Sequence, residues 1–175
     1  MSTRWYRAPE NVLGSRSYNY PVDIFALGCI MAELYTFRPL FPGSSEMDQW
    51  QKISMILGKP DTVDWPDAKR LADRKMFSLP EHSRINLQSV IPRASPEAIR
   101  LMDWCLSYNP KKRPKPSQVL QHEFFHPKTS ISHNLSPKTP NQRSSQDTTA
   151  DSRSRVDSLI IGQNQLLSKI AANAE

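Results

Sequence analysis

The hydrophobic residues of this 175-residue chain gather in stretches with helical spacing, and segments rich in proline separate them. Residues 22–35 follow a proline and are apolar on nearly every side, which predicts a helix in the middle of a domain. Ser44 or Ser45 is placed to cap a second helix, residues 46–57, and Gly58 supplies its end. The pattern predicts a mainly α-helical protein.

An irregular region follows, and two more helices are predicted after it. Residues 59–94 carry four prolines between short apolar groups and predict an ordered insert of loops and short helices. A helix is predicted to begin after Ser95, with Pro96 in its first turn and an apolar face that continues to Leu106. A last short helix is predicted over about residues 116–122.

The composition changes after Pro127, which predicts a domain over residues 1–127 and a tail over residues 128–175. Of the 29 residues from 127 to 155, 11 are Ser or Thr, and such a stretch buries too little apolar surface to offset its chain entropy. We expect a disordered tail. Its final part, residues 156–171, has one apolar stripe and is interpreted either as a short partner-binding helix or as an incidental pattern. The stripe comprises Val156, Leu159, Ile160, Gln163, Leu166, Leu167 and Ile170.

Charge and cysteine content narrow the class of protein. The formal net charge is +6, but the basic residues are scattered and residues 111–113 form the longest basic cluster, so a solvated surface is favoured over a nucleic-acid interface. The longest apolar run, residues 24–32, is too short to cross a bilayer, which takes about 20 residues. Cys29 and Cys105 lack CxxC spacing, which predicts a reducing, intracellular setting.

Four separated motifs stand in the order typical of one enzyme family. They are Thr3-Arg4-Trp5-Tyr6-Arg7-Ala8-Pro9-Glu10, Asp23 with Gly28, Arg38-Pro39-Leu40-Phe41-Pro42-Gly43, and Asn109-Pro110-Lys111-Lys112-Arg113-Pro114. Residues 1–127 therefore resemble a eukaryotic Ser/Thr protein kinase of the CMGC group, which holds the MAP kinases and cyclin-dependent kinases. Within that group the chain is most similar to the male germ cell-associated and intestinal-cell kinases, in residues 2–7, in Leu57-Gly58-Lys59-Pro60 with Asp64-Trp65-Pro66, and in Ile91-Pro92-Arg93-Ala94-Ser95. The resemblance implies a kinase-like C-lobe fragment, from the P+1 loop onward and with the CMGC insert, mainly α and without a sheet.

The resemblance also implies structural roles for three charged residues. Glu10 and Arg113 are expected to form a buried ion pair that braces the lobe, since a bidentate arginine suits a carboxylate. Asp23 is expected to support the catalytic loop of the family from beneath. As an alternative, Asp23 is an ordinary carboxylate at a helix start.

Four residues of the first motif are expected to face substrate or phosphate. By resemblance, Thr3 and Trp5 belong to the substrate-binding P+1 loop. Arg4 and Arg7 match arginines that grip a phosphorylated activation-loop tyrosine, because a doubly charged phosphate suits two guanidinium forks. The alternative for the two arginines is a solvent-facing position.

No catalytic residue is assigned. The sequence contains no Gly-rich phosphate loop, Val-Ala-Ile-Lys, His-Arg-Asp or Asp-Phe-Gly. ATP and Mg²⁺ are implied for the full-length family, whereas no cofactor and no metal are expected to bind this chain alone, which is predicted inactive. His122 and His126 have a spacing that suits a metal, but no further ligand stands nearby in sequence, so surface histidines are favoured.

Three interpretations from different classes remain. The first is a fragment of a Ser/Thr kinase whose parent protein phosphorylates Ser or Thr of protein substrates. The second is a non-catalytic interaction module that binds substrates or docking proteins through the insert, residues 41–94. The third, a nucleic-acid binder, is disfavoured because no recognition motif accompanies the positive charge.

No membrane association is expected. The location is predicted to be the cytoplasm or nucleus, with a cilium implied by resemblance only.

Overall fold

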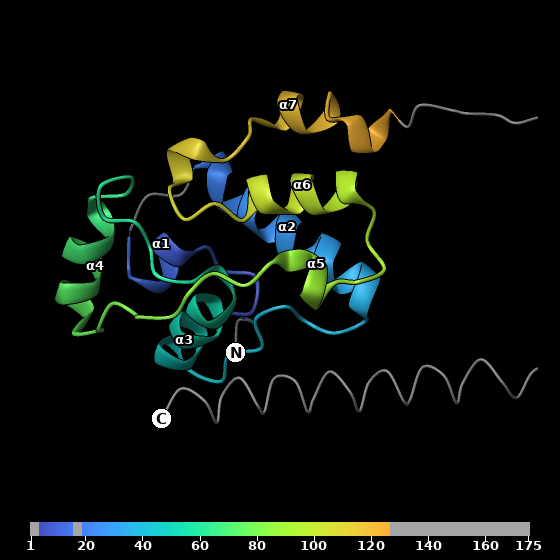
Figure 1. The fold of residues 1–175 in the computed structure, drawn as a ribbon. Coiled ribbons are helices and arrows are strands. Elements are labelled where there is room, and N and C mark those ends of the chain that lie inside the picture. The colour runs from blue at the N-terminus through green and yellow to red at the C-terminus, as the bar shows by residue number, and fades with distance from the viewer. Residues whose placement is uncertain (1–3, 16–18, 127–175) are drawn as a thin grey trace, which may run out of the picture. The chain divides into compact units, whose positions relative to one another are not determined.

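The structure, a computed structural model, describes residues 4–15 and 19–126, and these form helices without any strand (Figure 1). The mainly α class is therefore confirmed for the described residues. The predicted tail, residues 128–175, and its predicted helix, residues 156–171, lie outside them. The helices are α1 (Pro9–Val12), α2 (Tyr20–Thr36), α3 (Glu46–Leu57), α4 (Asp67–Lys75), α5 (Leu87–Val90), α6 (Pro96–Cys105) and α7 (Pro116–Leu120), with 3₁₀ turns η1 (Pro110–Lys112) and η2 (Glu123–Phe125).

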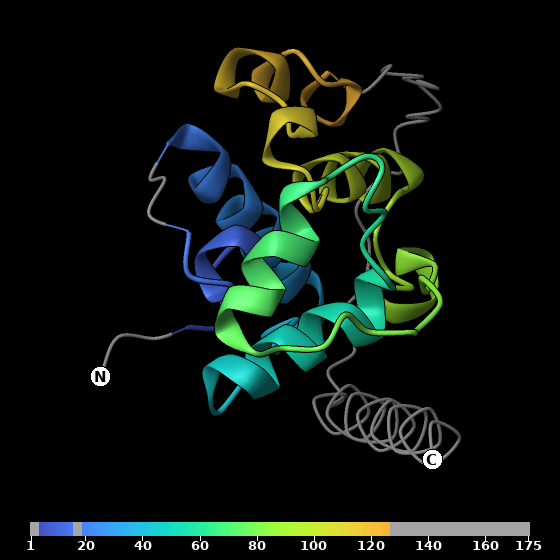
Figure 2. The same ribbon diagram turned by 90° about the vertical axis from the view of Figure 1, so that its left-hand side faces the viewer.

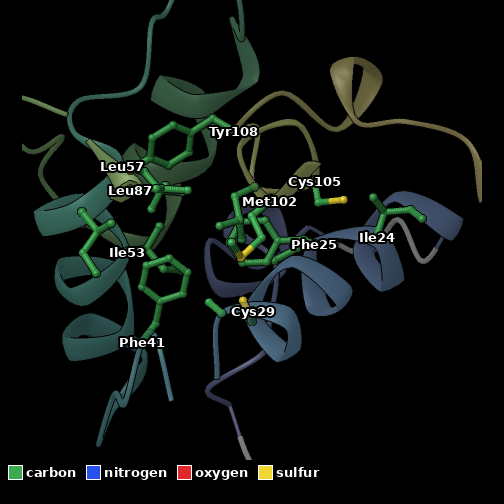
Figure 3. Packing of buried hydrophobic residues seen from close by; sticks show 14 of the residues in the cluster. Ile24, Phe25, Cys29, Phe41, Ile53, Leu57, Leu87, Met102, Cys105 and Tyr108 are labelled. Atoms are coloured by element: carbon green, nitrogen blue, oxygen red, sulfur yellow. The ribbon is translucent and has the colours of Figure 1, made fainter. Parts of the chain in front are cut away.

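The helices α2 and α6 pack side by side at the centre of the described region, as Figures 1 and 2 show from two sides. Phe25 and Cys29 of α2 lie with Met102 of α6 in one hydrophobic core (Figure 3). Gly28 makes this close approach possible, because a Cβ atom there would lie 2.9 Å from Cγ of Leu106. The prediction that residues 22–35 form a central helix is correct to within two residues at each end.

Polar caps fix where two of the helices begin. The Ser45 hydroxyl accepts a hydrogen bond from the backbone N–H of Asp48 at 3.1 Å, which satisfies an orphan donor of α3. Ser95 does the same for α6 through the N–H of Ala98 at 3.3 Å. Both caps stand where the sequence predicts them.

The part of the insert that lies between α3 and α6 packs against the side chain of Tyr108. The Tyr108 hydroxyl donates a hydrogen bond to the Gly58 carbonyl at 2.7 Å, and burial raises its pKa. The Trp65 ring stacks on the Tyr108 ring with centroids 6.0 Å apart, and Trp50 meets it edge-on at the same separation. Three aromatic side chains from distant positions therefore hold the insert against the helical core.

The outer face of α2 stays exposed. Ile30 and Leu34 lie on it, and Phe37 follows at the end of the helix with 82% of its surface exposed. Phe37 and Met76, which directly follow α2 and α4, have φ values of 57°, the left-handed conformation that favours glycine. Among the described residues, no helix is long and apolar enough to traverse a membrane.

Gly58→Ala tests whether the backbone at the end of α3 can accept a side chain at position 58. Gly58 has φ +76° and ψ −166°, and an added Cβ would lie 2.5 Å from the backbone nitrogen of Arg84. We expect the free energy of unfolding to fall by about 2–4 kcal/mol in urea denaturation, from strain and overpacking. Gly14 is the control, since its φ is +77° but its added Cβ would meet a flexible Lys75 side chain. Equal losses in the two variants would contradict a backbone clash at Gly58.

Candidate functional site

Glu10 of α1 and Arg113, which follows η1, form a bidentate ion pair inside the protein. The Arg113 Nη1 and Nη2 atoms each lie 2.7 Å from a different carboxylate oxygen of Glu10. The two residues are 103 positions apart, and only 5% of the Glu10 surface and 3% of the Arg113 surface is exposed. The structure thus brings together two residues that the sequence analysis pairs.

The remaining donors of Arg113 reach three backbone carbonyls. Its Nε atom donates to Ser107 at 2.8 Å, Nη1 to Pro21 at 2.9 Å and Nη2 to Tyr108 at 3.1 Å. Together with the two bonds to Glu10, all five N–H donors of the guanidinium have acceptors. The guanidinium carbon also lies 5.0 Å from the centroid of the Phe25 ring. One side chain therefore joins α1, the first turn of α2, and the segment between α6 and η1.

Asp23 does not join this pair. It lies in the first turn of α2 with its side chain exposed, where the helix dipole favours a negative charge. In the described part of the chain its carboxylate is therefore placed as a helix-start residue, and a role toward a catalytic loop stays a prediction.

The segment before α1 lies against the start of α3. The indole N–H of Trp5 donates to the Gly43 carbonyl at 3.1 Å, and Arg4 Nη1 donates to the Ser44 carbonyl at 2.6 Å. Gln49, fully buried, accepts from the Gly43 N–H at 3.1 Å and donates to the Trp5 carbonyl at 3.4 Å. Both ends of this amide are satisfied, so it fixes the segment in place.

Arg4 and Arg7 lie half-buried near the carboxylate of Glu46, the first residue of α3. Arg7 Nη1 is 3.9 Å from Glu46 Oε1, and Lys75 Nζ, at the end of α4, is 2.7 Å from Glu46 Oε2. The hydrogen bond from Lys75 lowers the pKa of the Glu46 carboxyl, and the charges of Arg7 and Arg4 lower it further. The Nε atom of Arg4 is buried and lacks a hydrogen-bond partner within the described ranges. Three cations thus surround one carboxylate.

Sequence reasoning missed three residues of this region: Gln49, Glu46 and Lys75. Lys75 lies 29 positions from Glu46, so no local pattern connects them. Of the two residues expected to face substrate, Trp5 is 38% exposed beside the start of α3, whereas Thr3 lies outside the described residues.

The last sequence motif, residues 109–114, contacts the insert at Asp64. The Asn109 side chain accepts from the Lys111 N–H at 3.0 Å and donates to the Asp64 carbonyl at 2.6 Å, while Lys112 pairs with the Asp64 carboxylate.

The two histidines whose spacing suits a metal, His122 and His126, contact nearby backbone groups. His122 Nδ1 accepts from the N–H of Phe124 at 3.2 Å, and His126 Nε2 lies 3.1 Å from the Leu120 carbonyl.

Comparison with known proteins identifies relatives for most of the chain. The profile of the family described as protein kinase domain matches residues 1–125. Serine/threonine-protein kinase MAK of Rattus norvegicus is 54% identical and serine/threonine-protein kinase ICK of Mus musculus 51% identical, each over 71% of this chain and 20% of the relative. Cyclin-dependent kinase F-4 of Oryza sativa is 44% identical over 80% of this chain and 32% of its own length.

These findings correct the lobe assignment made from the sequence. The profile matches the protein kinase domain at residues 1–125, and the MAK and ICK relatives align with the same N-terminal part of the chain. Neither match identifies a C-terminal lobe, and helices without strands do not by themselves assign one. The prediction of a C-terminal lobe is withdrawn, and residues 1–125 are described as protein kinase domain sequence.

Glu10→Ala and Arg113→Ala test the buried ion pair. Each variant leaves a buried, uncompensated charge, so we expect the free energy of unfolding to fall by about 3–5 kcal/mol in urea denaturation. The double variant should lose less than the sum of the single losses, because the two side chains act together. The control is Asp73→Ala, which breaks the exposed Lys69–Asp73 pair and should cost less than about 0.5 kcal/mol. Additive losses in the double-mutant cycle would show that Glu10 and Arg113 do not stabilise the protein as a pair.

Proposed function

Because this chain belongs to the protein kinase family, we propose that it is part of a Ser/Thr kinase that transfers the γ-phosphate of ATP to Ser or Thr of protein substrates. The identity of 54% and 51% to two serine/threonine-protein kinases over 125 residues carries this proposal. The chain spans about a fifth of the length of these relatives, so the activity is proposed for the whole protein.

The residues of this chain do not fit the cofactors of the family. Protein kinases hold ATP with a Gly-rich loop and a lysine, and they hold Mg²⁺ with an aspartate and an asparagine in fixed loop contexts. The sequence lacks these motifs, and the described residues contain no group of three or more His, Cys, Asp or Glu side chains suited to a metal. We therefore assign no step of phosphoryl transfer to this chain, and it is proposed to be inactive alone.

The proposed task of Arg4 and Arg7 is to bind the phosphate of a phosphorylated activation-loop tyrosine. The buried Nε atom of Arg4 without a partner within the described ranges supports this, since a buried donor favours an acceptor. Arg7 lies 3.9 Å from Glu46, beyond hydrogen-bond distance, so this contact leaves its donors available. A phosphate monoester supplies three acceptor oxygens and nearly two negative charges.

Other proposed roles rest on the family alone. Thr3 and Trp5 are proposed to line the surface that receives the substrate segment, and Asp23 to support a catalytic loop. The location in cytoplasm or nucleus, or at a cilium, stays a prediction.

A non-catalytic interaction module is the second candidate. The insert, residues 41–94, presents large apolar side chains that the fold does not use: Val63 is 88% and Met76 89% exposed. Exposed methionine adapts to differently shaped partners. On this proposal the insert binds protein substrates or docking proteins, and it does so whether or not the whole protein is active.

A phosphorylation assay tests the proposed inactivity. The purified chain, incubated with radiolabelled ATP, Mg²⁺ and a general Ser/Thr kinase substrate, should incorporate no more phosphate than a heat-treated sample. The Glu10→Ala variant, purified identically, reports contaminating kinases, because its fold is weakened while its contaminants are the same. Incorporation that rises with chain concentration and falls in this variant would contradict the proposal.

Titration with phenyl phosphate tests the arginine pair. We expect shifts of the arginine Nε–H resonances in NMR, and we expect Arg4→Ala or Arg7→Ala to weaken binding by about tenfold or more, since each removes roughly 1.4 kcal/mol or more of charge-assisted hydrogen bonding. Arg100→Ala is the control, because Arg100 pairs with Glu97 and Glu123 on α6 and η2. Equal weakening in all three variants would indicate a general charge effect and refute the assignment.

A further inference from the structure

Lys75, the last residue of α4, reaches the carboxylate of Glu46 at the start of α3. Its Nζ atom donates a hydrogen bond to Glu46 Oε2 at 2.7 Å. The stem of Lys75 passes over Gly14, where an added Cβ atom would lie 2.6 Å from the Lys75 Cε atom. The neighbouring Arg74 donates from Nη2 to the Gly14 carbonyl at 2.7 Å. The end of α4 is therefore anchored on the turn after α1, and this contact directs Lys75 toward Glu46.

Glu46 is hydrogen-bonded to Lys75, whereas its contact with Arg7 is long. Arg7 Nη1 lies 3.9 Å from Glu46 Oε1, beyond hydrogen-bond distance. The hydrogen bond from Lys75 is also the main cause of the lowered pKa of the Glu46 carboxyl, ahead of the charges of Arg7 and Arg4. Lys75 is therefore the partner that holds this carboxylate, and the guanidinium of Arg7 keeps its donors for another acceptor.

Without Lys75, the Glu46 carboxylate would close on Arg7. The side chains of Glu46 and Arg7 are 41% and 38% exposed, so neither is locked by packing. A guanidinium and a carboxylate bond most strongly in a bidentate arrangement, which the contact of 3.9 Å lacks. The closed pair would occupy the Arg7 donors that the proposed phosphate site requires, and it would place a negative charge beside the phosphate.

We propose that Lys75 holds Glu46 away from Arg7 and so keeps the Arg4–Arg7 site open to a phosphate monoester. This inference rests on the proposed function of the arginine pair. Lys75 is a positioning residue, because it acts through Glu46 and does not bind the phosphate. The insert, to which α4 belongs, therefore sets the phosphate affinity of a site built on the segment before α1.

A double-mutant cycle on the full chain, read as the dissociation constant of phenyl phosphate at fixed ionic strength, tests the proposal. Lys75→Met removes the charge but keeps an unbranched stem over Gly14. It should weaken binding about fivefold, as expected when a half-exposed ion pair forms in competition with the ligand. In the Glu46→Gln background the same change should weaken binding less than about twofold, because the carboxylate that closes on Arg7 is gone.

The ligand-free chain gives an independent readout. The Arg7 Nε–H resonance in NMR should shift in Lys75→Met, because Glu46 then bonds the guanidinium. It should return toward its wild-type position in the double variant Lys75→Met/Glu46→Gln. A merely structural role of Lys75 would move this resonance in both variants alike. Lys75→Gln, which also keeps a side chain over Gly14, repeats the measurements if Lys75→Met does not fold.

Two comparisons separate positioning from other effects of the charge. Lys59→Met removes the cation of the Lys59–Glu81 pair, also 2.7 Å apart and on the insert, and should change the dissociation constant less than about twofold. Equal weakening by Lys59→Met would show a general charge effect and refute the role of Lys75. If Lys75 bound the phosphate itself, Lys75→Met would weaken binding at least as much in the Glu46→Gln background, and that result would overturn the proposal.

Failure of this inference differs from failure of the proposed phosphate site. If the wild-type chain binds phenyl phosphate through Arg4 and Arg7, and Lys75→Met leaves the dissociation constant unchanged, Lys75 has no positioning role and the phosphate site stands. If the wild-type chain binds no phenyl phosphate, the phosphate site and this inference both fall.

Discussion

The fully bonded guanidinium of Arg113 is the interaction on which the rest of the described structure depends. Its five donors reach Glu10 on α1, Pro21 at the start of α2, and the carbonyls of Ser107 and Tyr108. These partners place the first segment of the chain beside the central helices, and Tyr108 in turn holds the insert at Gly58. A buried charge with a complete set of acceptors tolerates few alternative arrangements, so it specifies one geometry.

Two charge clusters in the described part of the chain, one around Arg113 and one around Glu46, differ in how completely they are bonded. The buried pair of Glu10 and Arg113 uses every donor, whereas the cluster around Glu46 is half-exposed, contains a long contact and leaves a donor of Arg4 without a partner among the described residues. A complete network stabilises a fold, and an incomplete one at the surface retains capacity for a ligand. This contrast separates the structural site from the proposed binding site.

The sequence predicted elements that local chemistry defines. The bounds of α3 follow from a serine before it and Gly58 after it, and the pairing of Glu10 with Arg113 came from family motifs. The helices α1 and α4 were not predicted individually. The helix α1 has only four residues, and α4 buries only Ala68, Leu71 and Ala72, so neither shows a clear apolar period. The contacts of Gln49, and the Lys75–Glu46 pair, join residues far apart in the chain, so no periodic pattern reveals them.

The helices α2 and α4 are each followed by a residue that strains the backbone. Glycine adopts that conformation without strain, yet Phe37 and Met76 occupy it, at a cost of about 1–2 kcal/mol each. Both side chains also project into water, where they add nothing to the core. Glycine at either position would therefore relieve that strain without removing a contact from the core.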